Sequence, residues 1–290
     1  MYHYIRKFDK ALPFQNFLHI ESFKKQIEYL KSQKKIMELN SKIADSYHKN
    51  RYLLTFDDGF KEHLQIARYL KKKKLLGIFF IPSLPLKKKT FLPIHKIHLL
   101  FARYNSSKIL KIFERFKILE NVKEDKKIFS LFKKQKKHMA NSKSSEVKKK
   151  TILKTILNNC DQDNYKIVDK IFNYCFTQKI QKTIFDKFYL SKKDILQIKK
   201  LGMVIGAHSD THRVLAKLNS KLQFKELAAS CQELEKIIKE KIIFFAYPYG
   251  GFEVFNASTI KILKKMKIKY CFNVESKNWS KLSNKLYIPR

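Results

Sequence analysis

The stretch Tyr52–Gly59, which is Tyr-Leu-Leu-Thr-Phe-Asp-Asp-Gly, decides the fold of this 290-residue chain. Its first half, Tyr52–Thr55, is short and apolar, which is typical of a strand buried on both faces of a parallel sheet. Four later runs share this character: Ile78–Ile81, Met203–Ala207, Ile242–Tyr247 and Tyr270–Val274. Because two acids and a glycine follow the first run after Phe56, we expect reactive groups where a strand ends.

Amphipathic stretches separate the expected strands: Glu62–Lys73, Ser191–Lys200 and Ser220–Glu240. The last two begin, at Ser191 and Ser220, with the spacing of a capping box, which marks the start of a helix. Strands that alternate with helices predict an α/β fold with a parallel sheet or barrel. Such folds collect their reactive side chains at the carboxyl ends of the strands.

The middle of the chain has a different pattern. Ile94–Leu201 contains no glycine or proline and is rich in lysine. Its apolar periodicity predicts several helices, at Ile109–Ile118, Lys126–Lys137, Glu146–Leu157 and Tyr165–Phe176. We expect a single domain over residues 1–290 with a long helical insertion, about residues 87–190, after an early strand. A substrate lid and a spacer are both open as its role.

The strongest feature of the composition is its charge. Lys and Arg number 63 against 25 Asp and Glu, for a formal net charge of +38. Only seven of the 63 are arginines, and surfaces that bind phosphates and bases depend heavily on arginine. The excess of lysine therefore favours a coding bias and argues against a nucleic-acid partner. Weak association with an anionic membrane surface or glycan stays open.

Several absences bear on the compartment. The start of the chain lacks the apolar run of a signal peptide, and no run of about 18 apolar residues predicts a transmembrane helix. The four cysteines (Cys160, Cys175, Cys231 and Cys271) are widely spaced, which indicates free thiols in a reducing compartment. We expect a cytoplasmic protein, with the inner face of the membrane as a second place where it could lie.

Three short motifs follow expected strands and concentrate the reactive side chains. They are Thr55–Gly59 (Thr-Phe-Asp-Asp-Gly), His208–His212 (His-Ser-Asp-Thr-His) and Ala246–Gly250 (Ala-Tyr-Pro-Tyr-Gly). Two histidines four apart and one carboxylate form a three-ligand metal site that leaves a position for water, the catalytic pattern. Each motif alone is common in turns and on helix surfaces. Their occurrence together, each after a strand, favours metal-assisted hydrolysis.

The three motifs in this order resemble the polysaccharide deacetylases, the NodB-homology family also known as carbohydrate esterase family 4. The resemblance extends from about Arg51 to the C-terminus, apart from the helical middle, and includes Tyr2-His3-Tyr4 at the start. It implies a distorted, incomplete (β/α) barrel and metal-dependent removal of acetyl groups from sugars.

The resemblance also implies roles for individual residues. Asp57 would be the general base, and Asp58, His208 and His212 would bind Zn²⁺ or another divalent metal. The backbone N–H of Tyr249 would help to hold the oxyanion. Pro248 and Gly250 would shape the turn that carries it, and Ser209 and Thr211 would orient the histidines.

The chain departs from the family at three places. Many members begin the third motif with an arginine that steadies the base, and Ala246 stands there. A later family segment, Asp-x-x-Asp-Trp, is matched only by Glu275–Trp279, with Asn278 for its second acid. Trp279, the one tryptophan, is expected either in the wall of a substrate pocket or in the core. The family also has a histidine near its C-terminus that acts as the general acid, and this chain lacks it. His3 is the best substitute for that histidine. The alternative is that His3 has a core or capping role.

We expect a metal-dependent hydrolase that removes acetyl groups from N-acetylated amino sugars of a surface polysaccharide or its precursor. The three departures motivate an alternative: a catalytically weak or inactive carbohydrate-binding relative. A polyanion binder, motivated by charge alone, ranks last because no nucleic-acid-binding motif supports it.

Overall fold

The computed structural model describes residues 1–41, 51–118, 145–160, 166–275 and 284–290. The chain forms two compact units. The first contains Met1–Lys7, Phe17–Thr90 and Phe185–Arg290, and the second contains Phe8–Asn16 and Phe91–Ile184. The assignment of all 290 residues to one domain stays a prediction.

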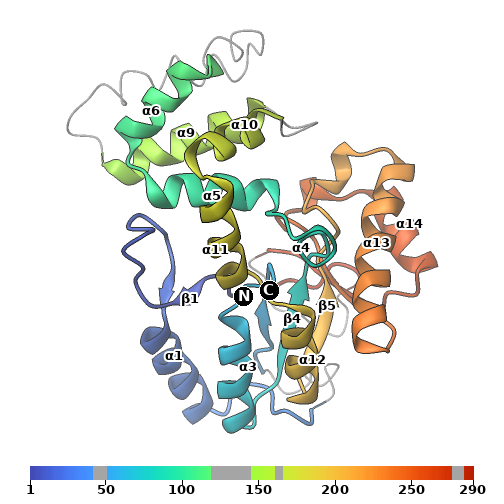
Figure 1. Ribbon diagram of the computed structural model, residues 1–290. Coiled ribbons are helices and arrows are strands. Elements are labelled where there is room, and N and C mark those ends of the chain that lie inside the picture. The colour runs from blue at the N-terminus through green and yellow to red at the C-terminus, as the bar shows by residue number, and fades with distance from the viewer. Residues whose placement is uncertain (42–50, 119–144, 161–165, 276–283) are drawn as a thin grey trace. The chain divides into compact units, whose positions relative to one another are not determined.

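The first unit is built on a five-stranded sheet (Figure 1). Its strands are β3 (Leu54–Phe56), β4 (Gly77–Ile81), β5 (Val204–Ala207), β6 (Phe244–Ala246) and β7 (Tyr270–Phe272). They pair in chain order, and every pair is parallel. The predicted α/β fold is confirmed: the parallel sheet is curled into a half-barrel.

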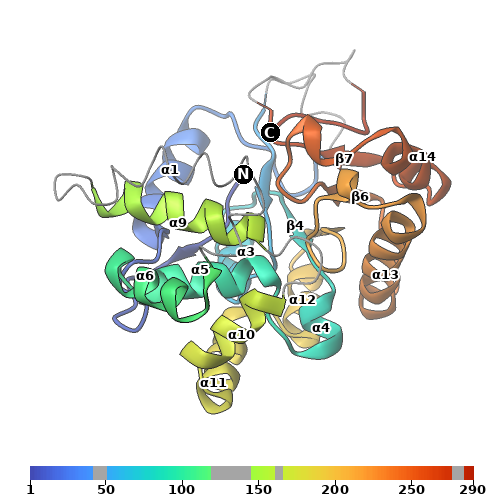
Figure 2. The same cartoon turned by 90° about the horizontal axis from the view of Figure 1, so that it is seen from above.

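Helices connect these strands, as parallel pairing requires. The first unit contains α1 (Ile20–Ser32), α3 (His63–Lys72), α4 (Leu84–Lys88), α12 (Lys192–Lys200), α13 (Ser220–Ile238) and α14 (Ala257–Lys265). Short 3₁₀ turns lie at η2 (Leu215–Lys217) and η3 (Phe252–Val254), and β1 (Ile5–Arg6) pairs in parallel with β2 (Leu18–His19). Helices α13 and α14 lie side by side near β6 and β7 (Figure 2).

Apolar side chains cover both faces of the sheet, which explains why the strands are continuous apolar runs. A large cluster includes Phe56 and Phe79 of the first two strands together with buried residues of α3, α12, α13 and α14. A smaller cluster contains Phe80, Ala246 and Phe272. Gly206 is required there, because a Cβ at this position would lie 2.5 Å from the ring of Phe80.

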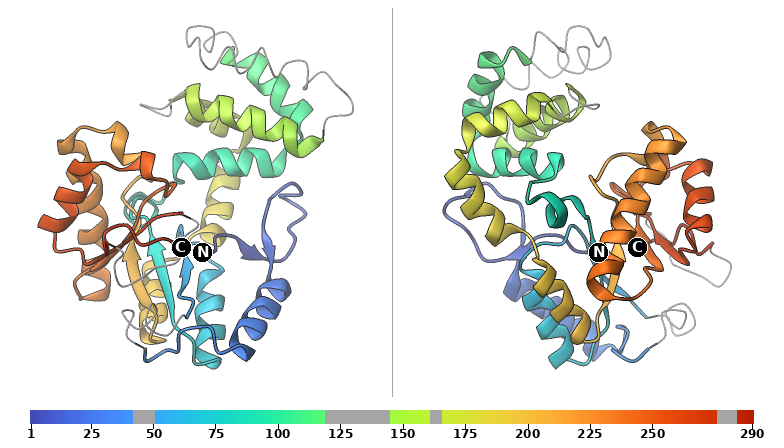
Figure 3. Two further views of the ribbon diagram at one scale, coloured as in Figure 1. Left: turned by 180° about the vertical axis from the view of Figure 1, so that it is seen from behind. Right: turned by 45° about the vertical axis from the view of Figure 1, so that its right-hand side comes forward.

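The two end segments of the chain extend the sheet at opposite edges. Tyr2 pairs in parallel with Phe56 of β3, and Ile288 pairs in parallel with Phe272 of β7. The termini nevertheless lie side by side, as both views of Figure 3 show. The sheet therefore curls far enough to bring its first and last strands close together.

The second unit is helical in its described part. It contains α5 (Pro93–Arg103), α6 (Ser106–Arg115), α9 (Glu146–Cys160), α10 (Lys166–Cys175) and most of α11 (Gln178–Phe188). Stacked rings of Phe172 and Phe176, with centroids 4.6 Å apart, form part of its core. The helix expected at Lys126–Lys137 lies outside the described residues. Within the described ranges, no helix has the length and apolar character needed to span a lipid bilayer.

The predicted capping boxes had different outcomes. The one at Ser191 is confirmed, because Ser191 and Asp194 each bind the other's backbone N–H at the start of α12. The one at Ser220 is wrong. Helix α13 is capped by Asn219, whose side chain accepts a hydrogen bond from the backbone N–H of Leu222 at 2.9 Å. Gln223 instead donates to the carbonyl of Leu218.

The cap of α13 can be tested with two neighbouring substitutions. Asn219→Ala removes the acceptor for a helix N–H and should lower the free energy of unfolding by about 1 kcal/mol. Ser220→Ala removes only an exposed hydroxyl that contacts Ser258, so it should have a much smaller effect. Urea unfolding of both variants measures the difference. A larger loss in Ser220→Ala would contradict the assignment of Asn219 as the cap.

Candidate active site

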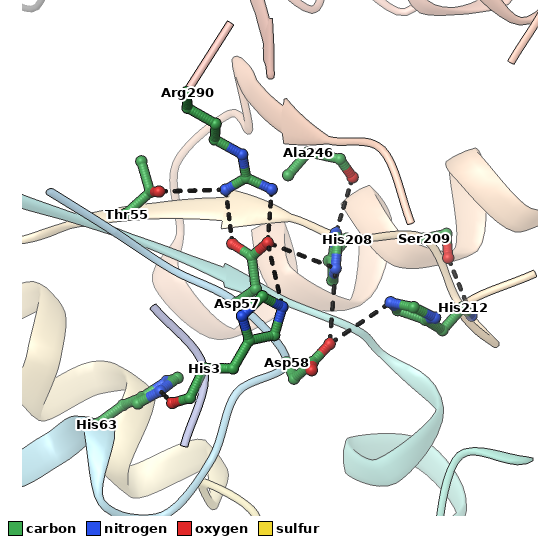
Figure 4. Close-up of polar contacts among 10 residues, drawn as sticks. All are labelled: His3, Thr55, Asp57, Asp58, His63, His208, Ser209, His212, Ala246 and Arg290. Atoms are coloured by element: carbon green, nitrogen blue, oxygen red, sulfur yellow. Dashed lines mark hydrogen bonds and ion pairs between the residues drawn. The ribbon is translucent and has the colours of Figure 1, made fainter. Parts of the chain in front are cut away.

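The two acids of the first motif lie directly after β3 in a sharp backbone turn. Asp57 and Asp58 are only 2% and 4% exposed. Asp58 and Gly59 both have left-handed backbone conformations, with φ of 74° and 64°. Such a conformation costs energy for a residue other than glycine, although aspartate adopts it more readily than most residues do. The turn allows the neighbouring carboxylates to point toward different partners (Figure 4).

The two histidines of the second motif lie at the ends of a tight loop after β5. Ser209 and His212 are also left-handed, with φ of 59° and 60°, and the Ser209 hydroxyl accepts a hydrogen bond from the backbone N–H of His212 at 3.0 Å. Asp210 accepts hydrogen bonds from the Ser83 hydroxyl and from Lys87. The loop is therefore held in its conformation by its own side chains and by α4.

Asp58, His208 and His212 form a buried cluster with the geometry of a metal site. Oδ1 of Asp58 lies 3.6 Å from Nε2 of His208 and 3.5 Å from Nε2 of His212. One ligand atom from each residue lies within 4.8 Å of the others, and among the described residues this is the one such group of three. Two imidazoles and a carboxylate suit Zn²⁺ and similar divalent metals, so the residues fit the predicted cofactor.

His208 is held in the form that binds metal. Its Nδ1 donates a hydrogen bond to the carbonyl of Ala246 at 2.8 Å, which leaves Nε2 as the acceptor that faces Asp58. Burial lowers the pKa of His208 and outweighs the opposite effect of Asp57 and Asp58. A neutral imidazole whose other nitrogen donates to a carbonyl is the usual arrangement of a metal ligand.

Asp57 lies beside this cluster but has a different partner. Arg290 forms two hydrogen bonds with it, from Nη1 to Oδ1 at 2.7 Å and from Nη2 to Oδ2 at 2.5 Å. Burial raises the pKa of Asp57, but Arg290, with smaller contributions from His208 and His3, lowers it to about 2. Asp57 is therefore a carboxylate at neutral pH, and its Oδ2 lies 4.0 Å from Nε2 of His208.

His3 reaches the same carboxylate from the N-terminal segment. Its Nε2 lies 3.9 Å from Oδ2 of Asp57, and its side chain is 41% exposed. Its backbone carbonyl accepts a hydrogen bond from Nε2 of the buried His63 at 2.9 Å. Burial lowers the pKa of His63 to about 4, so this imidazole is neutral at pH 7. His63 thus fixes the backbone that carries His3.

The third motif forms a turn that adjoins the histidines. Tyr249 and Gly250 have φ of 65° and 82°, and the carbonyl of Gly250 accepts a hydrogen bond from the backbone N–H of Val274 at 2.8 Å. A Cβ at Gly250 would lie 2.1 Å from Val274, so a larger residue does not fit. The ring of Tyr249 lies 4.9 Å from that of His212. The predicted turn is therefore close to the cluster.

The structure brings together most of the predicted site residues: Asp57, Asp58, His208, His212, His3 and Tyr249, with Pro248 and Gly250 in the adjoining turn. Trp279 and Asn278 lie outside the described residues. The Ser209 hydroxyl accepts a hydrogen bond from the backbone N–H of His212, so Ser209 holds the loop, and its expected role in orienting a histidine stays a prediction. Thr211 does not orient a histidine ring; its backbone N–H and hydroxyl donate to Glu226 at 2.8 and 2.6 Å.

Sequence reasoning missed two participants, Arg290 and His63. A signal for Arg290 exists in the composition. In a chain with 56 lysines and seven arginines, an arginine is expected where two parallel hydrogen bonds to a carboxylate are needed. Arg6 follows the same rule, because it binds Glu62 near β1. No local pattern around His63 distinguishes it from an ordinary buried histidine.

The structure thus combines a half-barrel of parallel strands with a buried carboxylate and two histidines at the strand ends, a group of residues suited to holding a metal ion. Residues 163–271 match the sequence model of the polysaccharide deacetylase family. The matched range includes the second and third motifs, and the structure adds the acids of the first. The resemblance to the polysaccharide deacetylases that the three motifs indicate is confirmed.

A segment of the chain also resembles a curated protein. Over 110 residues it is 33% identical to the poly-beta-1,6-N-acetyl-D-glucosamine N-deacetylase of Staphylococcus aureus. The aligned segment is 35% of this chain and 37% of that protein. The chain therefore spans little more than a third of the curated relatives it matches.

Solved structures of deacetylases have a similar fold. The deacetylase PplD of Streptococcus pyogenes, solved in complex with acetate, has a TM-score of 0.58 at 14% identity and is covered over 88% of its length. IcaB from Ammonifex degensii has a TM-score of 0.53 at 15% identity, also over 88% of its length. Both similarities cover 100% of this chain and support the half-barrel fold.

The cluster predicts how the protein binds metal. Asp58→Asn, His208→Ala and His212→Ala each remove one ligand. Each should weaken Zn²⁺ binding by more than the roughly 10- to 100-fold cost of losing an outer-shell partner. Isothermal titration of the metal-free protein measures this, with His19→Ala, which removes an exposed histidine at the end of β2, as the control. Equal affinity in the wild type and all three variants would contradict a metal site here.

The burial of His63 predicts a dependence of stability on pH. Below pH 6.5 the unfolded chain takes up a proton on this imidazole, whereas the folded protein does so only near pH 4. The free energy of unfolding should therefore fall between pH 7 and 4, by up to about 3 kcal/mol from this group. His63→Gln should flatten the profile in urea titrations across that range. A profile as steep as that of the wild type would contradict the assignment.

Proposed function

We propose that the protein is a metal-dependent deacetylase that removes acetyl groups from N-acetylated amino sugars of a surface polysaccharide or its precursor. The observation that carries this proposal is the buried Asp58–His208–His212 cluster, with the carboxylate of Asp57 only 4.0 Å from one of its histidines. A carboxylate that can act as general base, placed beside a three-ligand metal site, is an arrangement suited to amide hydrolysis.

Asp58, His208 and His212 are the proposed metal ligands. A divalent metal bound there would polarise the acetamide carbonyl and lower the pKa of water. Asp58 supplies a carboxylate oxygen, and both histidines present Nε2 to the same space. The loop contacts of Ser209 and Asp210 hold this arrangement in place before substrate arrives, which is what precise catalysis requires.

Asp57 is the proposed general base. It is ionised at neutral pH and accepts a proton from the attacking water. His3, whose Nε2 lies 3.9 Å from Oδ2 of Asp57, is the proposed general acid that protonates the leaving amine. Hydrolysis breaks the C–N bond, adds water across it, and releases acetate and a sugar amine. The pKa of Asp57, near 2, makes it a weak base, so its contribution depends on position rather than on basicity.

The backbone N–H of Tyr249 is the proposed donor to the oxyanion of the tetrahedral intermediate. Its left-handed turn is anchored by the Gly250 carbonyl and Val274, and Pro248 precedes it. A donor fixed in this way costs no reorganisation when charge develops on the substrate. Trp279 stays a predicted contact with the sugar.

The chemistry of the site and the similarity to a curated deacetylase support the proposed substrate class. The Staphylococcus aureus relative is named for poly-beta-1,6-N-acetyl-D-glucosamine. We propose that this chain acts on the same kind of bond, the amide of an N-acetyl group on a glucosamine. The cytoplasmic compartment, with association at the inner membrane face, stays a prediction.

The proposal is tested by release of acetate from N-acetylglucosamine oligomers by metal-loaded protein. Asp57→Asn removes the base and should lower kcat by roughly 10²- to 10⁴-fold while leaving Zn²⁺ bound. A chelator should abolish the activity, and added Zn²⁺ should restore it. Asp186→Asn, at an exposed position on α11, is the matched control and should behave as the wild type.

Two results separate the alternatives. Metal-loaded wild-type protein that binds the oligomers but releases no acetate would support the inactive carbohydrate-binding relative. Acetate release that is equal in the wild type and Asp57→Asn would overturn the assigned base.

A further inference from the structure

Arg290 holds the carboxylate of Asp57 by both oxygens. Nη1 donates to Oδ1 and Nη2 to Oδ2, and Nη1 also lies 3.2 Å from the hydroxyl of Thr55. The side chains of Arg290 and Asp57 are only 5% and 2% exposed. One hydrogen bond would let the carboxylate turn about its Cβ–Cγ bond. Two parallel bonds from a planar guanidinium fix the plane of the carboxylate.

The fixed plane determines which oxygen of Asp57 faces the site. Oδ2 lies 3.9 Å from Nε2 of His3 and 4.0 Å from Nε2 of His208 (Figure 4). Oδ1 faces away from both, toward Thr55 and Nη1. Rotation of the carboxylate would therefore move the proposed proton-accepting oxygen away from both histidines.

Arg290 reaches Asp57 from the opposite edge of the sheet. The segment 284–290 runs along β7: the backbone N–H of Ile288 donates to Cys271 at 2.7 Å, and that of Asn273 donates to Ile288 at 2.9 Å. The buried hydroxyl of Tyr247 also donates to the carbonyl of Leu286 at 2.7 Å. The guanidinium passes over the ring of Phe80, 5.2 Å from its centroid. Asp57, by contrast, follows β3.

We propose that Arg290 is a positioning residue for Asp57, and that the segment 284–290 is part of the active site. This inference rests on the proposed function. The arginine that steadies the base in many deacetylases is absent from the third motif, where Ala246 packs with Phe80 and Ile288 in the smaller cluster. The same function is carried instead by a residue outside all three motifs, anchored on β7.

Arg290 could act on Asp57 in two ways: it could fix the plane of the carboxylate, or it could only neutralise its charge. A substitution by lysine distinguishes the two. A lysine at 290 would keep a positive charge beside Asp57 but would offer no planar pair of donors. If charge alone matters, Arg290→Lys should behave as the wild type. If the plane of the carboxylate matters, Arg290→Lys should lose activity although the charge is kept.

The experiment measures kcat and KM for acetate release from N-acetylglucosamine oligomers, with bound Zn²⁺ and the melting temperature determined for each variant. Arg290→Ala should lower kcat by about 100-fold, the typical cost of a misplaced catalytic group, with KM little changed and Zn²⁺ still bound. Guanidinium at a non-denaturing concentration should restore part of the lost kcat. Arg290→Lys should lose activity and gain nothing from guanidinium. Arg68→Ala, which removes an exposed arginine that binds Gln197, is the control.

Tyr247→Phe gives a second test that leaves Arg290 in place. It removes the hydroxyl that holds Leu286 and should lower kcat in the wild type. It should have little further effect in Arg290→Ala, because both changes act on the same contact. Independent, additive losses would contradict the role of the segment.

The outcomes separate this inference from the proposed function. Wild-type protein that releases no acetate from any oligomer overturns the proposed function, and the inference falls with it. Active wild-type protein with full kcat in Arg290→Ala or Arg290→Lys overturns the inference alone. So does a loss of activity that follows the loss of Zn²⁺ or of folded protein and does not respond to guanidinium.

Discussion

The parallel pairing of β3 to β7 is the constraint on which the site depends. Because every strand runs in the same direction, the residues that follow the strands meet at one edge of the sheet. Asp57 and Asp58 follow β3, His208 follows β5, and the Ala246 carbonyl that orients His208 ends β6. An antiparallel neighbour at any of these places would have sent its motif to the other edge. The curl of the sheet then closes the distance between β3 and β7, which allows Arg290 to contact Asp57.

The edge of the sheet that carries the reactive residues also includes backbone conformations and buried polar groups that lower the stability of the fold. Four residues of the motifs, Asp58, Ser209, His212 and Tyr249, have left-handed backbones without being glycine. Each such residue costs on the order of 1 kcal/mol or more, and acids and histidines are buried among them. Packing in the two apolar clusters offsets this cost. The loops are then held by short polar contacts, such as those of Asp210 and Glu226.

Sequence patterns predicted the parts of the fold that depend on local character. The buried strands were recognisable because short, continuous apolar runs stand out in a chain with 30% charged residues and indicate strands that are covered on both faces. The metal cluster was predictable because its ligands lie in short motifs directly after strands. The partner of Arg290 was not predictable, since the two residues lie 233 positions apart and nothing near Arg290 forms a motif; the scarcity of arginine is the signal that the sequence offers. The cap of α13 was misassigned by one residue, because Asn219 and Ser220 are both good caps and only geometry separates them.

The contacts that hold the site also determine where the chain can change. Before the helical second unit begins, the backbone of Ser83 and Leu84 donates to Ser209 and Asp210 of the histidine loop. After that unit ends, the backbone of Leu190 donates to Gly59, beside the two acids. The chain is thus fastened to the site on both sides of residues 91–184. Because these contacts lie outside residues 91–184, a change in the length of the intervening helices would leave the backbone contacts of the site in place.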